Sequence, residues 1–291
     1  MKATEPVQDR QVVWISCPDE TGLIHKITGA LFRLGANIVQ TGEFVDRKAQ
    51  QFFMRIEFVK AGPGSIAEGS VENELRSMLP ASPTTVVELR RNHRRKLVLL
   101  ATRESHCLGD LLLRHQAGEL KADVLGVVSQ YDSLHDLVRR FEIPFHCVPV
   151  GDLSREAHEA KLLQVIDGFR PDYVVLAKYM RVLTPGFVAR FPNRILNIHH
   201  SFLPAFVGAS PYQQAYERGV KIIGATSHFV NEDLDEGPII TQAVLPVTHA
   251  LDAPEMARQG RDVERVALAQ ALKLVLEDRV LVHGKRTIIF E

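Results

Sequence analysis

Short apolar segments alternate with helix-like segments along most of this 291-residue chain, and this alternation limits the possible folds most strongly. The expected strands lie at 97–101, 124–129, 145–150, 173–177, 194–199 and 222–230. Helical patterns lie between most of them, for instance at 134–141 and 158–169. Strands that alternate with helices predict an α/β fold with a mainly parallel, Rossmann-like sheet covered on both faces. Ligands of such sheets bind at the carboxyl ends of the strands.

The segment before residue 93 predicts a separate, smaller unit. Its expected strands are 11–17, 37–45, 52–59 and 84–89, and its expected helices are 22–34 and 66–79. The resulting β-α-β-β-α-β order is the ferredoxin-like pattern. Because 291 residues exceed the usual size of one domain, we expect two domains, 1–92 and 93–291. The basic run at 90–96 is expected to be solvated linker charge.

Charge and cysteine content exclude several classes of protein. The 35 Lys and Arg residues equal the 35 Asp and Glu residues, which argues against binding nucleic acid or anionic membrane through bulk charge. The apolar runs are far shorter than a membrane span, and the first residues lack the apolar core of a signal peptide. Three scattered cysteines argue against a disulfide framework or a thiolate zinc site, and favour a cytoplasmic location. After these classes are excluded, an enzyme or a sensor that acts on small molecules remains.

The turn after the first strand of the larger domain lacks a nucleotide-binding motif. It has the sequence TRESHCLGD over residues 102–110, with neither a G-x-G-x-x-G pattern nor a P-loop. A nicotinamide-dependent dehydrogenase is therefore disfavoured despite the Rossmann-like alternation.

Polar residues gather at the ends of two other expected strands. Asn197 and His199 are two residues apart near the end of one strand, so they face the same side. Asp235 lies in an acidic loop that follows the strand at 222–230. Each residue alone also has a purely structural explanation. Asn197 could stabilise a turn, His199 could form a hydrogen bond in the core, and the acidic loop could be solvated. Together, an amide, an imidazole and a carboxylate could form one site.

Longer motifs give these clusters a family resemblance. The stretches NIHHSFLPAF (197–206), AKYMRVLTP (177–185) and H-x-V-x-x-x-x-D-x-G-P-I-I (228–240) resemble the folate-dependent formyltransferases, and the match spans most of residues 96–290. The resemblance implies three catalytic residues, namely Asn197, His199 and Asp235. It implies folate contacts from Met180, Arg181, Val182, Leu183, Asn231, Glu232, Leu234 and Gly237. Supporting hydrogen bonds are expected from His106, His200 and His228.

The smaller unit resembles an ACT domain, a regulatory module that often binds amino acids. The resemblance rests on PDETGLI (18–24) and GANI (35–38). It implies an effector site at Asp19, Gly22, Leu23 and Asn37, because N–H groups at a helix N-terminus suit a ligand carboxylate. It also implies glycine or methionine as effector, and a homo-oligomer. The alternative is that Asp19 only caps the helix and Gly22 only relieves a tight turn.

One departure from the resemblance points to water as the formyl acceptor. Transferases that act on a ribonucleotide have a Gly/Ser-rich phosphate loop where this chain has ESHCLG (104–109). The expected reaction is hydrolysis of 10-formyltetrahydrofolate to formate and tetrahydrofolate, which would supply formate for purine biosynthesis and balance the folate pools. Asn197 and protonated His199 would stabilise the oxyanion, while Asp235 would stabilise that imidazolium and position the water. No cofactor beyond the folate substrate and no metal is expected, since adjacent histidines do not match a zinc motif.

Two other functions stay open on the sequence alone. The first is formyl transfer to an amine, such as a nucleotide sugar or a tRNA-bound amino acid. The second is a catalytically silent sensor of amino acids or folate. Formate release without an added amine would favour hydrolysis, whereas folate binding without formate release would favour the sensor.

Overall fold

The computed structural model describes residues 10–62, 66–67, 69–91, 93–205 and 210–291. These residues divide into two compact units: 94–287, and a smaller unit that contains the chain up to His93 together with Ile288–Glu291. The last four residues therefore group with the N-terminal unit and not with the 93–291 domain expected from the sequence. Asn92 at the expected boundary and Phe206 of the NIHHSFLPAF motif lie outside the described residues.

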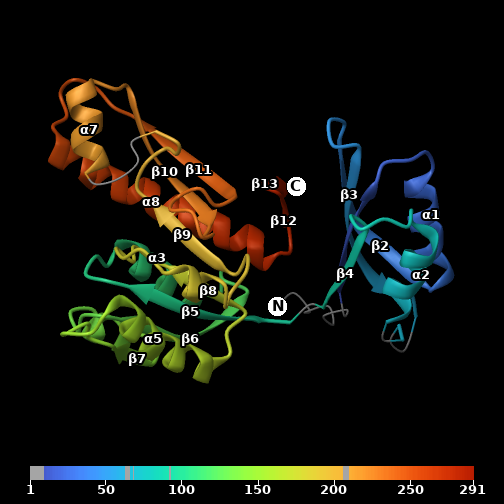
Figure 1. Cartoon of the computed structure of the whole chain (residues 1–291), viewed down its shortest axis with the longest axis horizontal. Helices are drawn as coiled ribbons and strands as arrows, with labels where there is room; N and C mark the ends of the chain where they lie inside the picture. The colour runs from blue at the N-terminus through green and yellow to red at the C-terminus, as the bar shows by residue number, and fades with distance from the viewer. Residues whose placement is uncertain (1–9, 63–65, 68, 92, 206–209) are drawn as a thin grey trace, which may run out of the picture. The chain divides into compact units, whose positions relative to one another are not determined.

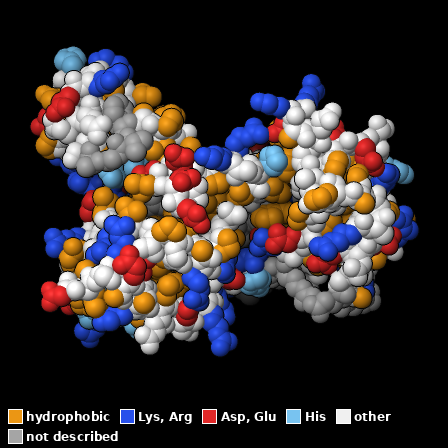
Figure 2. All heavy atoms as spheres, viewed as in Figure 1, with side chains coloured by type: hydrophobic (Ala, Val, Ile, Leu, Met, Phe, Trp, Pro, Cys, Tyr) orange, Lys and Arg blue, Asp and Glu red, His pale blue; other side chains and the backbone are white. Residues whose placement is uncertain are grey.

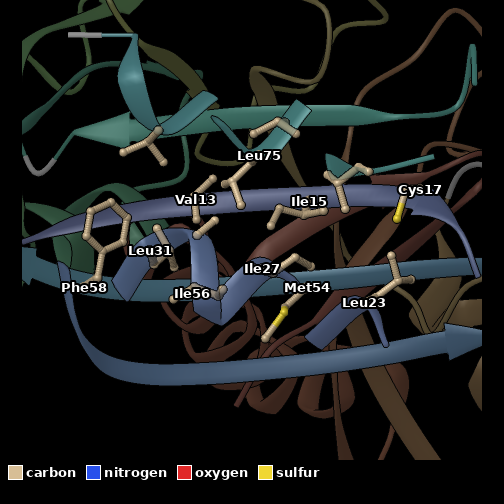
Figure 3. Close-up of a cluster of buried hydrophobic side chains, with 14 of the residues drawn as sticks. Val13, Ile15, Cys17, Leu23, Ile27, Leu31, Met54, Ile56, Phe58 and Leu75 are labelled. Atoms are coloured by element: carbon tan, nitrogen blue, oxygen red, sulfur yellow. The ribbon is translucent and has the colours of Figure 1, made fainter. Parts of the chain in front are cut away.

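The N-terminal unit has the expected β-α-β-β-α-β order (Figure 1). Its elements are β1 (Gln11–Pro18), α1 (Leu23–Arg33), β2 (Ala36–Asp46), β3 (Gln51–Lys60), α2 (Ser70–Met78) and β4 (Val86–Arg91). The strands form an antiparallel sheet in the order β2-β3-β1-β4. Apolar side chains from the sheet and both helices form one buried cluster, part of which appears in Figure 3. Helix α2 begins later than expected, after Gly69 in the left-handed region (φ 74°).

Seven strands form the sheet of the larger unit, in the order β11-β10-β9-β8-β5-β6-β7. Five of them run parallel: β5 (Arg95–Ala101), β6 (Ala122–Ser129), β7 (Phe145–Cys147), β8 (Tyr173–Leu176) and β9 (Ile195–His199). Strands β10 (Ile222–Phe229) and β11 (Ile239–Pro246) continue the sheet antiparallel. The prediction of a mainly parallel sheet in an α/β fold is therefore confirmed.

Helices follow most strands of this sheet along the chain, and the last of them comes after β11 (Figure 1). They are α3 (His106–Gln116), α4 (His135–Arg139), α5 (Arg155–Phe169), α6 (Pro185–Val188), α7 (Pro211–Arg218) and α8 (Ala253–Leu276). A short two-stranded sheet, β12 (Val280–His283) with β13 (Arg286–Ile289), ends the chain. None of the helices in the described ranges is long and apolar enough to cross a membrane.

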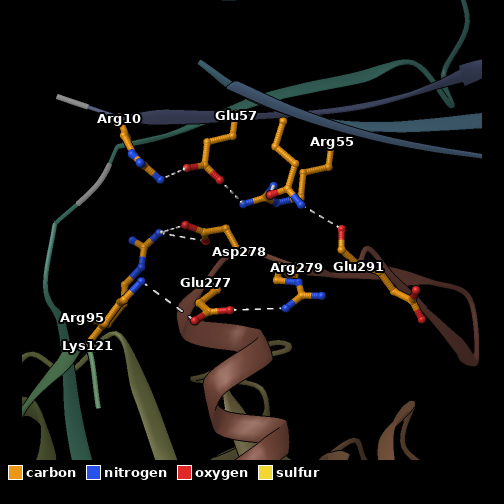
Figure 4. A network of polar contacts seen from close by, with 10 residues as sticks. Arg10, Arg55, Glu57, Arg95, Lys121, Glu277, Asp278, Arg279 and Glu291 are labelled. Atoms are coloured by element: carbon orange, nitrogen blue, oxygen red, sulfur yellow. Dashed lines mark hydrogen bonds and ion pairs between the residues drawn. The ribbon is translucent and has the colours of Figure 1, made fainter. Parts of the chain in front are cut away.

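A buried ion pair joins the first strand of the large sheet to the end of its longest helix. Nη2 of Arg95 lies 2.9 and 3.0 Å from the two carboxylate oxygens of Asp278, just after α8 (Figure 4). Hydrogen bonds between charged groups of this kind are stronger than those between neutral groups. On the surface, cationic and anionic side chains are interspersed over the visible face of each unit, in keeping with the balanced composition (Figure 2).

Candidate active site

The three residues expected to be catalytic come together at one end of the large sheet. Asn197 and His199 belong to the last residues of β9, and His228 of the antiparallel strand β10 is directly opposite Asn197 in the register. Asp235 lies in the loop that connects β10 to β11, with a left-handed backbone (φ 57°). The return of this loop towards β9 brings its carboxylate to the imidazole.

Asp235 contacts two histidines. Its Oδ2 lies 3.3 Å from Nδ1 of His199, and its Oδ1 lies 3.8 Å from Nε2 of His228. Burial alone would raise the pKa of the Asp235 carboxyl, but the hydrogen bond from His199 and the interactions with the surrounding histidines together lower it by more. The carboxylate is therefore ionised at neutral pH. Since Nδ1 of His199 faces this carboxylate, its Nε2 is the ring atom left for a substrate.

Nε2 of His199 is indeed buried without a hydrogen-bond partner among the described residues. Buried polar atoms of this kind are rare in folded proteins, and one that faces a cavity is suited to bind a polar ligand atom. Oδ1 of Asn231, in the loop between β10 and β11, is a second buried polar atom without a partner among the described residues. Both residues line the same cavity, so both unpaired atoms fit a site for a polar ligand.

The orientation of the Asn197 amide follows from its contact with His228. Nδ1 of His228 lies 2.9 Å from the backbone oxygen of Phe229, which can only accept, so Nδ1 has the proton. Burial lowers the pKa of His228, so the ring is neutral and its Nε2 is an acceptor. Nδ2 of Asn197, 3.2 Å away, must therefore donate to it. The second N–H of the same amide is left for a ligand oxygen.

His200 lies beside the imidazole of His199 in the cavity lining. Its ring stacks on that of His199 with centroids 5.1 Å apart, and it lies 6.2 Å from the ring of Tyr212. Burial, followed by the charges of Lys178 and His199, lowers the pKa of His200 to about 4. His200 is therefore neutral at pH 7 and places no positive charge beside the ring of His199.

The cavity at this site has a volume of about 230 Å³. Its lining contains the three residues expected to be catalytic, His200, His228 and every residue expected to contact folate except Gly237. Three apolar side chains of the lining are more than two-fifths exposed and face no core: Met180 (54%), Val182 (44%) and Leu234 (58%). The lining also contains five residues that were not among the expected site residues, which are Leu176, Tyr179, Ile198, Val230 and Asp233.

Gly237 serves the loop and not the cavity lining. A Cβ at this position would lie 1.7 Å from the backbone oxygen of Phe229 and 3.2 Å from Nδ1 of His228. Only glycine allows the loop to pass so close to β10. The residue thereby holds the loop that positions Asp235.

His106 lies in a different polar cluster, outside the cavity lining. Its Nε2 is 2.7 Å from Oε2 of Glu264 on α8, and the same oxygen is 3.0 Å from Nζ of Lys178. His106, Cys107 and Glu264 offer three potential metal ligands within 4.8 Å of one another. However, the ammonium of Lys178 already supplies the positive charge that this carboxylate requires, so the arrangement is that of an ion-pair network.

The residues of the expected effector site divide into two groups. Asp19, Gly22 and Asn37 are exposed, whereas Leu23 is 2% exposed and belongs to the buried cluster of its unit. The interpretation of Asp19 as a helix cap is wrong: Gly22 occupies the N-cap position, and no side chain caps the helix. Gly22 itself has φ 90°, as its role in a tight turn requires.

Comparisons with known proteins point to one family for the whole chain. The formyl transferase family model matches residues 95–272. The chain is 53% identical over 280 residues to the formyltetrahydrofolate deformylase of Escherichia coli O6:H1 (strain CFT073), with 96% of this chain and 98% of that protein covered. The crystal structure of a formyltetrahydrofolate deformylase from Pseudomonas syringae pv. tomato str. DC3000 matches with a TM-score of 0.92 and 37% identity, over 99% of this chain and 96% of that one. A glycinamide ribonucleotide transformylase from Symbiobacterium toebii matches with a TM-score of 0.66 and 34% identity, over 69% of this chain and 96% of that one.

Proposed function

The chain belongs to the formyltetrahydrofolate deformylases, within the formyl transferase family, and from this premise we propose how its residues perform their reaction. The reaction is hydrolysis of 10-formyltetrahydrofolate to formate and tetrahydrofolate. The observation that supports our assignment most directly is the pairing of Asp235 with Nδ1 of His199, a side chain of the cavity lining whose buried Nε2 has no hydrogen-bond partner among the described residues. Asn197, His199 and Asp235 are thus the proposed catalytic residues.

In the proposed mechanism, a water molecule attacks the formyl carbon bound to N10. Negative charge then develops on the formyl oxygen, where one N–H of Asn197 and Nε2–H of protonated His199 donate hydrogen bonds. Asp235 holds the imidazolium through Nδ1 and accepts the proton that the attacking water loses. The C–N10 bond then breaks, and this proton passes to N10. The products are formate and tetrahydrofolate.

Folate is proposed to bind along the exposed apolar side chains of the cavity. Met180 and Val182 on one side and Leu234 on the other can contact the flat ring systems of the substrate. Polar groups among the expected contacts, such as Arg181 and Asn231, can then fix the orientation of the rings. The mechanism requires no metal, because the charged groups at the reacting oxygen are those of the protein.

Water is the proposed acceptor because the start of α3 does not favour a phosphate. His106 lies between two carboxylates there, with Glu104 3.5 Å from Nδ1 and Glu264 2.7 Å from Nε2. Glu104 adds negative charge at this helix N-terminus, and the nearby cation Lys178 is already paired with Glu264, so a phosphate anion is disfavoured there. A ribonucleotide amine therefore has poor anchorage at this position.

The purified protein is expected to release formate from 10-formyltetrahydrofolate in the absence of any amine. Formate would be measured with a coupled assay, and tetrahydrofolate by its absorbance. The control reaction contains glycinamide ribonucleotide as a competing acceptor. Formate release that depends on the amine, or folate binding without formate release, would contradict hydrolysis.

For the N-terminal unit, we propose regulation by an amino acid, glycine or methionine, bound near Asp19, Gly22 and Asn37. Support comes from the ferredoxin-like fold and from the exposed, uncapped N-terminus of α1. Calorimetric titration of the full chain with each amino acid should give a saturable heat and a change in rate for one of them. If neither amino acid gives a heat of binding or a change in rate, this proposal is wrong.

We further propose that the protein is a cytoplasmic homo-oligomer. The free cysteines Cys17 and Cys107 are buried, as suits a reducing compartment. The ACT resemblance favours association between subunits. A solution mass equal to the 32.6 kDa of one chain would contradict the oligomer.

A further inference from the structure

The proposed folate-binding segment has no regular secondary structure of its own. It runs from the end of β8 to the start of α6, and its residues 179–183 all line the cavity. Strand and helix ladders do not fix its backbone, although it presents Met180 and Val182 to the cavity. Such a segment needs other contacts to keep one conformation before the substrate binds.

A buried carboxylate holds the C-terminal end of this segment. Glu159 of α5 is 5% exposed, and its Oε1 accepts a hydrogen bond of 2.9 Å from the backbone N–H of Thr184. Its Oε2 accepts a second hydrogen bond from the hydroxyl of the same threonine. Hydrogen bonds to an ionised acceptor are stronger than neutral ones, so Thr184 is tightly fixed.

A second buried carboxylate holds the N-terminal end. Lys178 has a left-handed backbone (φ 64°), its carbonyl oxygen accepts from the hydroxyl of Thr102 at 2.9 Å, and its ammonium lies 3.0 Å from Glu264. Both charged side chains are at most 5% exposed. Glu264 also accepts hydrogen bonds from His106 and from Tyr212 (2.9 Å). Burial alone would raise its pKa, but the hydrogen bond from His106 and the charge of Lys178 lower it to about 2.

Neither glutamate lines the cavity, and the proposed mechanism uses neither. A non-glycine residue in the left-handed region and two buried carboxylates each cost free energy unless the surrounding structure compensates. Here these unfavourable groups lie at the two ends of one short segment, residues 179–183. Such groups at both ends are expected if they fix the backbone conformation of the segment.

We propose that Glu159 and Glu264 are positioning residues that clamp the two ends of the folate-binding segment 179–183, through Thr184 and Lys178. The proposal rests on the assignment of this segment to folate, which is part of the function proposed above. The clamp reduces the ordering that the substrate must impose on the segment. Its loss therefore weakens folate binding and leaves the chemistry at His199 largely intact.

The decisive variant is Glu159→Ala, with Glu156→Ala as its matched control. Glu156 lies on the same helix and is exposed, whereas Glu159 is buried. We expect Glu159→Ala to raise KM for 10-formyltetrahydrofolate about 10- to 100-fold, the range for a lost hydrogen bond to a charged group, with kcat within about threefold. Glu159→Gln keeps an acceptor and should recover part of the loss. Glu156→Ala should behave as the unchanged enzyme.

Three further variants keep the test decisive if Glu159→Ala does not fold, as far-UV circular dichroism would report. Thr184→Val removes the hydroxyl that donates to Glu159, whereas Thr184→Ser keeps it. Valine should raise KM and serine should not. At the other end, Lys178→Met should raise KM in the same way. An unchanged KM in the folded variants, or a loss confined to kcat, would overturn the clamp.

Binding of tetrahydrofolate separates this inference from the proposed function. Titration of the full chain with tetrahydrofolate measures the segment without any chemistry. If the enzyme releases formate and Glu159→Ala binds tetrahydrofolate normally, the clamp is wrong and the function stands. If tetrahydrofolate binding depends on Glu159 but no formate is released, the function is wrong and the clamp stands.

Discussion

Asp235→Asn is expected to lower kcat by about two to four orders of magnitude, the range for a positioned acid–base group. Asparagine has nearly the same shape and tolerates the left-handed backbone of this position (φ 57°), so the loop should stay in place. What it removes is the negative charge 3.3 Å from Nδ1 of His199, together with the acceptor for the proton of water. Steady-state formate release would measure the loss.

The matched control for this substitution is Asp167→Asn. Asp167 forms an exposed ion pair with Arg190 in the same unit, and exposed pairs contribute little. The kcat of the Asp167→Asn variant should stay close to that of the unchanged enzyme. Because the pKa of Asp235 is lowered, protonation of this carboxylate should reduce the rate only below its usual titration range. Near-normal turnover by Asp235→Asn would remove Asp235 from the mechanism.

The sequence predicted those parts of the fold that depend on local pattern. Apolar runs of β5, β6 and β8 identified buried parallel strands, since strands covered on both faces are continuously apolar. Strand β7 is shorter than the expected 145–150, because only Phe145–Cys147 pair with β6. The grouping of Ile288–Glu291 with the N-terminal unit was not predictable, because it depends on contacts far along the chain.

The site was predictable to the same extent. The two-residue spacing of Asn197 and His199 placed them on one face of a strand, and the structure brings Asp235 to them. What the spacing could not reveal is that β10 runs antiparallel to β9, which brings His228 opposite Asn197 and orients its amide. Local sequence patterns do not encode strand direction.

Buried charges were the hardest to predict. Glu264 lies in α8, far along the chain from its partners His106 and Lys178. A glutamate in an amphipathic helix is usually solvated, so only the packing of α8 on the sheet shows that this one is buried. Glu159 is similar, since its partner Thr184 lies beyond β8. Residues that act through such distant contacts leave no local motif.

Asn197→Ala is expected to lower kcat about 10²- to 10³-fold, the cost of losing one donor to a developing oxyanion. One N–H of this amide is already committed to Nε2 of His228, so the side chain cannot rotate freely and its second N–H has a defined direction. A donor fixed in advance favours the transition state over the ground state, because the formyl oxygen gains its charge only during the reaction. KM should therefore change little.

Asn197→Asp separates the donor role from a simple loss of contacts. Aspartate fills the same space but presents only acceptor oxygens to both His228 and the formyl oxygen, so it should be at least as damaging as alanine. If Asn197 instead only binds the substrate, alanine should raise KM and leave kcat intact. The neutral ring of His228 sets the direction of the Asn197 amide. Adding His228→Ala to Asn197→Ala should therefore lower kcat little further. Fully additive losses would mean that His228 acts on the reaction by a separate route, through its 3.8 Å contact with Asp235.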